Sequence, residues 1–139
     1  SFLNAISVDE RRRVAYISDS GMRSAPDNMV GLIVVDFASG QARRVLDKHP
    51  GLQVEPGVQV VSHGAEVWPG NPLLLGINGI ALSPDARTLY WTVTTGTRAL
   101  SVPTSVLRTT TANDAQIARH IVDIKGAIDR LKEQVQNVE

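Results

Sequence analysis

The stretch Ile77-Asn78-Gly79-Ile80-Ala81-Leu82-Ser83 has a counterpart near the start of the chain, Leu3-Asn4-Ala5-Ile6-Ser7-Val8-Asp9. In each copy an Asn is followed by alternating apolar residues, an Asp-containing turn and a strand with an aromatic residue. Those second strands are Val14-Ala15-Tyr16-Ile17-Ser18 and Thr88-Leu89-Tyr90-Trp91-Thr92, and the two Asn residues stand 74 positions apart. A lone four-stranded sheet cannot bury both of its faces, so the repeat predicts stacked copies of one β-sheet unit.

Short strands separated by turn residues fill the first hundred positions. In the first copy we expect strands at Leu3–Val8, Val14–Ser18, Gly31–Asp36 and Ala42–Leu46, and in the second at Ile77–Leu82, Thr88–Val93 and Ala99–Val102. Four antiparallel strands in about 45 residues have the size of one propeller blade. The sequence therefore predicts an all-β fold, a partial β-propeller of about two four-stranded antiparallel blades.

The predicted domain organisation places the partial propeller at residues 1–111. Its blades cover about 2–46 and 73–103, and a proline-rich inserted loop or hairpin, with Val58–Ser62 as one arm, occupies 47–72. The chain begins without an initiator Met, so we expect it to be a fragment of a longer propeller protein.

The segment 112–139 has a different character, with apolar residues spaced alternately four and three apart. They are Ile117, Ile121, Ile124, Ile128, Leu131, Val135 and Val138. This spacing predicts a C-terminal amphipathic helical tail, capped by Asn113 or Asp114. Gly126 makes two helices as consistent with the pattern as one. The tail either lies on the propeller body or drives self-association.

Composition excludes some classes of partner. Fourteen basic residues balance fourteen acidic ones, which argues against a nucleic-acid surface or an anionic membrane. Cysteine is absent, so disulfides, thiolate metal sites and a Cys nucleophile are excluded.

Several segments resemble the bacterial branch of the major royal jelly protein/yellow family. They are Val14–Gly21, Gly31–Gly40, Arg43–Leu46, Gly76–Asp85, Pro103–Arg108 and Asp114–Ala118. The resemblance covers roughly residues 2–124 and implies a β-propeller that binds a small ligand. It also suggests a secreted or periplasmic location.

The motif from Asn78 to Asp85 is also similar to one in the more distantly related gluconolactonase/regucalcin-type six-bladed propellers. There the Asn of the motif is a divalent-metal ligand at the central channel, and a second Asn ligand begins the innermost strand of the preceding blade. The resemblance implies that Asn4 and Asn78 form half of a site for Ca²⁺ or another divalent cation. Ala5 follows Asn4 where the relatives usually have Asp, so this half-site contains only neutral oxygens. Alternatively, each Asn bonds nearby backbone at the start of its strand.

Three functions follow from these observations. The preferred one is a small-ligand-binding propeller with no complete catalytic site in this chain. The second is a gluconolactonase-like hydrolase, in which a bound divalent cation would polarise a lactone carbonyl and activate water. The third is an interaction module that oligomerises through the tail, and the open edges of the blades are a second route to self-association.

Other side chains give weaker signals. His49, His63 and His120 lack the spacing of a metal-binding pair, and we expect them to be solvated. Trp68, Tyr90 and Trp91 are candidates to line a ligand pocket, although at least one of Tyr90 and Trp91 should lie in the core between blades. Arg11-Arg12-Arg13 is interpreted as a solvated turn.

Overall fold

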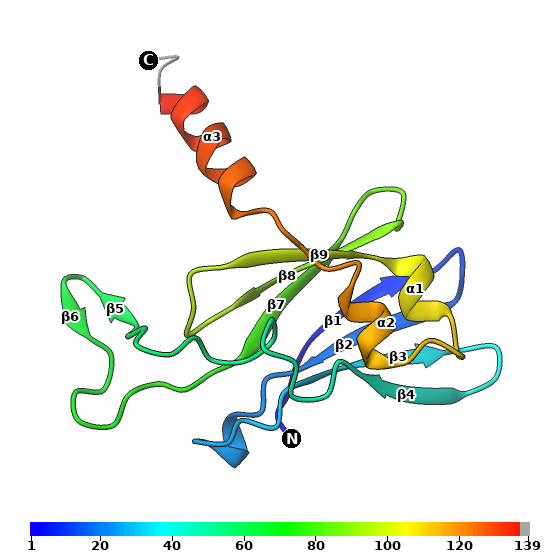
Figure 1. Cartoon of the computed structure of the whole chain (residues 1–139), viewed down its shortest axis with the longest axis horizontal. Helices are drawn as coiled ribbons and strands as arrows, with labels where there is room; N and C mark the ends of the chain where they lie inside the picture. The colour runs from blue at the N-terminus through cyan, green and yellow to red at the C-terminus, as the bar shows by residue number, and fades with distance from the viewer. Residues whose placement is uncertain (137–139) are drawn as a thin grey trace.

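Two four-stranded antiparallel sheets dominate the structure, a computed structural model that describes residues 1–136 (Figure 1). The first sheet has the order β1 (Leu3–Asp9), β2 (Val14–Asp19), β3 (Gly31–Asp36) and β4 (Gln41–Val45). The second contains β7 (Ile77–Leu82), β8 (Thr88–Val93), β9 (Ala99–Pro103) and β10 (Val122–Asp123). A short hairpin in the inserted stretch pairs β5 (Val61–Ser62) with β6 (Ala65–Glu66). The mostly β fold with consecutive antiparallel strands confirms the predicted class.

Short helices lie among and after the strands. They are a 3-10 turn at Met22–Ser24, α1 (Thr104–Arg108), α2 (Asp114–Ala118) and α3 (Lys125–Gln136). Figure 1 shows α1 and α2 beside the two sheets, whereas α3 projects away from them.

The internal repeat is visible in the strand register. Tyr16 lies opposite Ser7 in the first sheet, and Tyr90 lies opposite Ala81 in the second. Each innermost pair also contains an irregularity at the equivalent place, between Leu3 and Ile6 in β1 and between Ile77 and Ile80 in β7. The two sequence copies are therefore copies of one sheet unit, including its local bulge.

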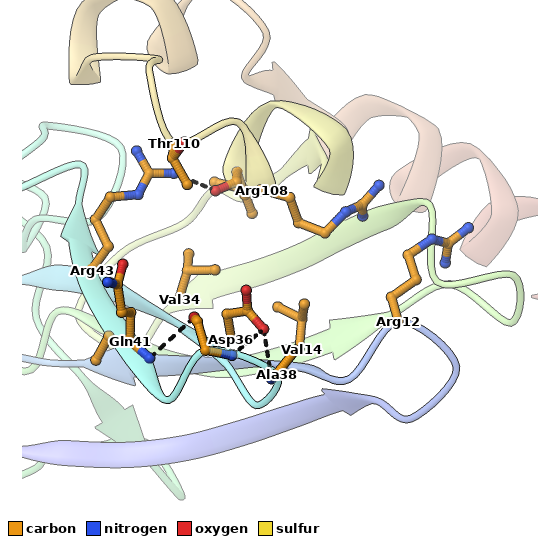
Figure 2. Close-up of a pocket in the computed structure, with 12 residues that line it drawn as sticks. Arg12, Val14, Val34, Asp36, Ala38, Gln41, Arg43, Arg108 and Thr110 are labelled. Carbon is orange, nitrogen blue, oxygen red and sulfur yellow. Dashed lines mark hydrogen bonds between the residues drawn. The ribbon is translucent and has the colours of Figure 1, made fainter.

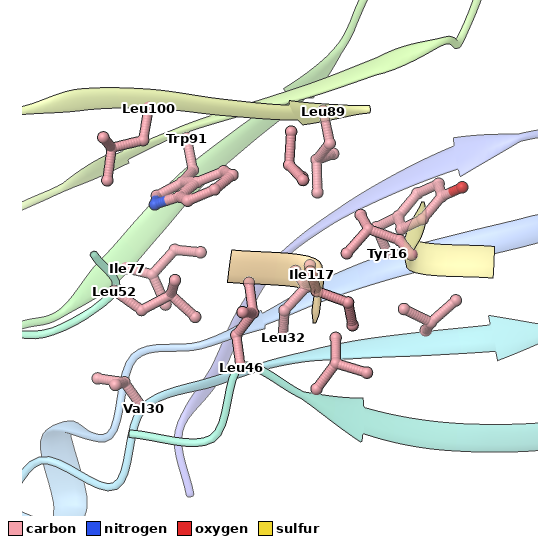
Figure 3. Packing of buried hydrophobic residues seen from close by; sticks show 14 of the residues in the cluster. Tyr16, Val30, Leu32, Leu46, Leu52, Ile77, Leu89, Trp91, Leu100 and Ile117 are labelled. Carbon is pink, nitrogen blue, oxygen red and sulfur yellow. The ribbon is translucent and has the colours of Figure 1, made fainter. Parts of the chain in front are cut away.

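The hydrophobic core lies between the two sheets. Tyr16 and Leu32 of the first sheet and Leu89 and Trp91 of the second are almost completely buried. Figure 3 shows these side chains converging, with Ile117 of α2 among them. The Trp91 indole N–H donates to the carbonyl of Gly51 at 3.0 Å, so the buried ring also has its polar group satisfied.

The innermost strands β1 and β7 lie side by side and are connected by hydroxyl groups. Ser18 of β2 donates to the carbonyl of Asn78 at 2.8 Å, and Ser7 donates to the carbonyl of Ile80 at 3.3 Å. These bonds satisfy carbonyls on β7 that no neighbouring strand reaches.

The tail forms two helices, one of the two patterns that the sequence allowed, but the break between them covers residues 119–124 and is not at Lys125-Gly126. Asn113 caps α2 with a reciprocal capping box, as the sequence suggested, but α2 ends at Ala118. The chain then forms β10, in which Val122 pairs with Ser101 of β9. The free edge of β9 offers backbone hydrogen bonds that a continuous helix could not use, so tertiary pairing overrides the periodicity. The second sheet therefore continues to Asp123, well beyond residue 103.

The seven apolar residues spaced four and three apart in the tail consequently do not form one continuous stripe on one helix. Ile117 is fully buried in the core and Ile121 packs against it, whereas Leu131 on α3 is 60% exposed. Val138 lies outside the described residues.

Asp19 joins three parts of the first sheet although it is completely buried. Its carboxylate accepts from the backbone N–H of Phe2 at 2.7 Å and of Gly21 at 3.2 Å, and from the Arg44 guanidinium at 2.7 Å. Burial alone would raise the pKa of Asp19, but these hydrogen bonds outweigh burial and lower the pKa to about 2.

Asp19→Asn is expected to lower the free energy of unfolding at pH 7 by about 2 kcal/mol, the equivalent of the shift from 3.8 to about 2. Because the folded pKa is depressed, the stabilisation is complete above pH 3.8 and disappears as the pH falls through about 2. Urea unfolding of both proteins between pH 7 and 2 measures this difference. A difference that stays constant as the pH is lowered would show that ionisation of Asp19 is not its source.

A second carboxylate fastens α2 to the end of β4. Asp114 accepts from the backbone N–H of Leu46 at 2.8 Å and of Asp47 at 3.0 Å. Leu46 is fully buried, so its N–H has no access to water if this acceptor is removed.

Asp114→Ala should therefore destabilise the protein by about 1–3 kcal/mol, the range for a buried donor left unsatisfied. Asp129→Ala is the matched control, because Asp129 pairs with Lys125 on the surface of α3 and its removal should change stability much less than Asp114→Ala does. Thermal unfolding of the two variants tests this, and equal small shifts would contradict the assigned role of Asp114.

Candidate ligand-binding sites

The predicted metal half-site lies at the starts of the two innermost strands. Asn4 is exposed and Asn78 is half-buried, and each lies within the bulge of its strand. The side-chain amide of Asn78 donates to Thr94 Oγ1 at 3.0 Å, which leaves its carbonyl oxygen as the end able to contact a cation. The pair can thus offer amide oxygens of the kind that Ca²⁺ accepts.

The acidic group near Asn4, that of Asp19, already accepts hydrogen bonds from other residues. Asp19 lies opposite Leu3, but its oxygens accept the hydrogen bonds of Phe2, Gly21 and Arg44. Among residues 1–136, no group of three or more His, Cys, Asp or Glu side chains is arranged to hold a metal ion. The Asn pair therefore remains a predicted half-site.

A larger cleft of about 660 Å³ opens at the opposite ends of the first-sheet strands, between that sheet and α1. Its walls come from the β1–β2 turn, the β3–β4 hairpin and the α1 region, and its lining residues are Arg12, Val14, Val34, Asp36, Ala38, Ser39, Gln41, Ala42, Arg43, Leu107, Arg108 and Thr110. Figure 2 shows Val14, Val34 and Asp36 between Arg43 on one side and Arg12 and Arg108 on the other.

Cross-strand register explains why these side chains share one face. Tyr16, Val34 and Arg43 form one row across β2, β3 and β4, and the next row outward is Val14, Asp36 and Gln41. Tyr16 belongs to the core between the sheets, so the cleft is the outward continuation of that core face. The cleft is therefore lined by apolar residues near the core and by polar residues near the strand ends.

Arginine dominates the charge of the cleft. Arg43 donates to the carbonyls of Ala112 at 3.0 Å and Leu107 at 2.5 Å, and Arg108 donates to Thr104 Oγ1 at 2.8 Å. Arg12 instead forms an ion pair of 2.9 Å with the buried carboxylate of Asp9.

The acidic groups around the cleft remain ionised. Burial opposes ionisation of Asp9, but hydrogen bonds from Arg12 and the positive charges of Arg12 and Arg108 lower its pKa. Asp36 accepts from the backbone N–H of Ala38 at 2.7 Å, and this bond, with others from Ser39 and the nearby charge of Arg13, lowers the pKa of Asp36.

The sequence interpretation missed this cleft. It treated Arg12 as part of a solvated turn and did not single out Arg43 or Arg108. A signal was present in β4, where Arg43 stands two positions before the buried Val45 and so occupies the inward-facing side of an edge strand.

The three aromatic residues considered for a ligand pocket lie in different environments. Trp91 is 2% exposed in the core, which confirms that one of the Tyr90–Trp91 pair is core, while Tyr90 faces outward. Trp68 is exposed and lines a smaller pocket of about 370 Å³ with Met22, Pro26 and Leu74.

The histidines are exposed at positions 63 and 120, as expected, but His49 is half-buried. Its Nδ1 accepts from the N–H of Gly51 at 3.0 Å, and burial lowers its pKa. His49 therefore shapes the loop that receives the Trp91 indole.

None of the described helices is long and apolar enough to cross a membrane.

Two antiparallel four-stranded sheets stack face to face with their first strands adjacent, which is the arrangement of neighbouring β-propeller blades. The chain belongs to the major royal jelly protein family, because the sequence model of that family matches residues 1–136. Comparison with curated proteins gave no match.

Proposed function

We propose that the chain is a small-ligand-binding propeller protein of the bacterial branch of this family and that its ligand occupies the cleft between the first sheet and α1. The cleft carries the proposal, because its 660 Å³ falls within the range of about 300–1,000 Å³ typical of ligand sites. Val14, Val34 and Leu107 provide apolar contact area, and a few polar groups around them can orient a ligand.

The lining favours binding over catalysis. It contains no His or Cys, and the Ser39 hydroxyl, which accepts from the N–H of Gln41, has only the Asp36 carboxylate beside it, a weak base because its pKa is lowered. The carboxylate of Asp36 stays ionised because of its hydrogen bonds, so it is a poor general acid.

Further blades would complete this protein, as the resemblance to six-bladed propellers suggests. Ile6 and Leu3 of β1 are 60% and 55% exposed on the side of the first sheet that faces away from the second. Apolar surface of this kind is normally covered by a neighbouring blade. The same family resemblance supports a secreted or periplasmic location as part of the proposal.

Gln41→Trp should abolish ligand binding by filling the cleft, since Gln41 faces it from an edge strand that tolerates aromatic residues. Val8→Trp places the same ring on the opposite, exposed face of the same sheet and is the control. The probes are 2-naphthoate and 2-naphthamide, titrated calorimetrically into each protein. The proposal requires that at least one probe binds the wild type and the control, and that it fails to bind Gln41→Trp.

A metal-dependent lactone hydrolase is the second candidate, and the orientation of the Asn78 amide favours it. Its nitrogen is held by Thr94, so its oxygen is available at the end of β7 that lies beside Asn4 and β1. A divalent cation bound there would polarise a lactone carbonyl. Acidic ligands supplied by other blades would be required.

Ala5→Asp tests this half-site by placing a carboxylate where the gluconolactonase-type relatives usually carry one. It should raise Ca²⁺ affinity at least tenfold over the wild type in calorimetric titration, since Ca²⁺ affinity depends on the charge of its ligands. Adding Asn78→Ala should reverse the gain, whereas Ser105→Asp, at an exposed position of α1, should produce none. No gain in Ala5→Asp would remove the Asn pair from consideration as a metal site.

A further inference from the structure

Two guanidinium groups at the cleft have no acidic partner. The ion pairs formed within residues 1–136 involve Arg12, Arg44, Arg87, Arg98 and Lys125, and neither Arg43 nor Arg108. Both are half-buried and donate only to uncharged oxygens. In a chain whose formal charge is zero, two unpaired arginines on one cleft are a local positive excess.

The remaining charges of the cleft do not cancel this excess. Asp9 is neutralised by Arg12 through their 2.9 Å ion pair, and its pKa also responds to the charge of Arg108. Asp36 lines the cleft and forms no ion pair within residues 1–136. Arg12, Arg43 and Arg108 therefore outnumber Asp9 and Asp36 by one positive charge.

We propose that the cleft binds an organic anion, a carboxylate or phosphate group attached to an apolar body. This inference rests on the proposed ligand-binding function and names its ligand class. Guanidinium groups match both anions in geometry and keep their charge at any physiological pH. The apolar body lies along Val14, Val34 and Leu107, and the anionic group contacts Arg108, while Arg43 adds positive charge from the other side of the cleft.

The arrangement fits an organic anion better than a simple ion. Burial of apolar surface contributes about 25 cal/mol per Å². A ligand with only a charged group would bury no apolar surface against Val14 and Val34, so it would bind without this contribution. A neutral apolar ligand would instead leave two half-buried guanidinium groups to lose water without a compensating charge.

Calorimetric titration of three naphthalene probes with one ring system tests the charge preference in the whole protein. 2-Naphthoate and 2-naphthyl phosphate carry the two anionic groups, and 2-naphthamide is neutral. At least one anion should bind about tenfold or more tightly than the amide, as hydrogen bonds to charged groups allow. The ratio between the two anions distinguishes a carboxylate ligand from a phosphate ligand. Added salt should weaken binding of the anions only.

Arg108→Gln identifies the responsible side chain, since Gln can still donate to Thr104 and Arg108 has no carboxylate partner within residues 1–136. It should lower the anion affinity about tenfold while leaving the affinity for the amide unchanged. Arg11→Gln is the matched control, because Arg11 is exposed and lies outside the cleft. The substitution removes the same charge from a position that does not line the cleft. Arg108→Lys should recover part of the affinity.

The outcomes separate the two proposals. Equal binding of amide and anions, blocked by Gln41→Trp, would overturn the anion class and keep the ligand-binding function. No binding of any probe would overturn both. An equal loss of anion affinity in Arg11→Gln and Arg108→Gln would show a general charge effect and overturn the site. Thermal unfolding of each variant confirms that it is folded, and the comparison of probes in the wild type stands without any variant.

Discussion

The face-to-face burial of the two sheets is the interaction on which the rest of the structure depends. A four-stranded sheet cannot cover its own apolar faces, so Tyr16 and Leu32 need Leu89 and Trp91 opposite them. The removal of these large side chains from water is the main favourable term. The loop that carries Gly51 and the segment that carries Ile117 reach their positions because they complete the same core.

Polar contacts around this core mainly fix the positions of the segments that connect the sheets, and they contribute less to stability than the buried side chains do. Asp114 holds α2 against the end of β4, and Arg43 donates to carbonyls at Leu107 and Ala112 on either side of the connecting loop. Each group satisfies backbone atoms that the strand ladders leave free, which is why the loops after β4 and β9 have defined positions. The same contacts leave the Arg43 guanidinium at the cleft, so the connection between the blades also creates the charge of the candidate site.

The cleft lies where the inward face of the first sheet extends beyond the residues buried in the core. From one row of β2, β3 and β4 to the next, the buried Tyr16 and Val34 are followed toward the strand ends by Asp36 and Gln41. Arg108 is added from α1 in the segment after β9. The site is thus assembled from three separate parts of the chain, around positions 12, 36–43 and 107–110, which no local motif connects.

Local sequence determined the strands and the repeat, because alternation of apolar residues and turn chemistry act within a few residues. The seven strands predicted in the two copies agree with the structure to within one residue at each end, and the bulges at Asn4 and Asn78 occur in equivalent places. Only tertiary structure decided the fate of the tail, where the unpaired edge of β9 drew Val122–Asp123 into the sheet against a helical periodicity. Tertiary structure also created the arginine cleft, because the distance between Arg43 and Arg108 in the fold depends on how two sheets pack, and that packing has no signature in either segment alone.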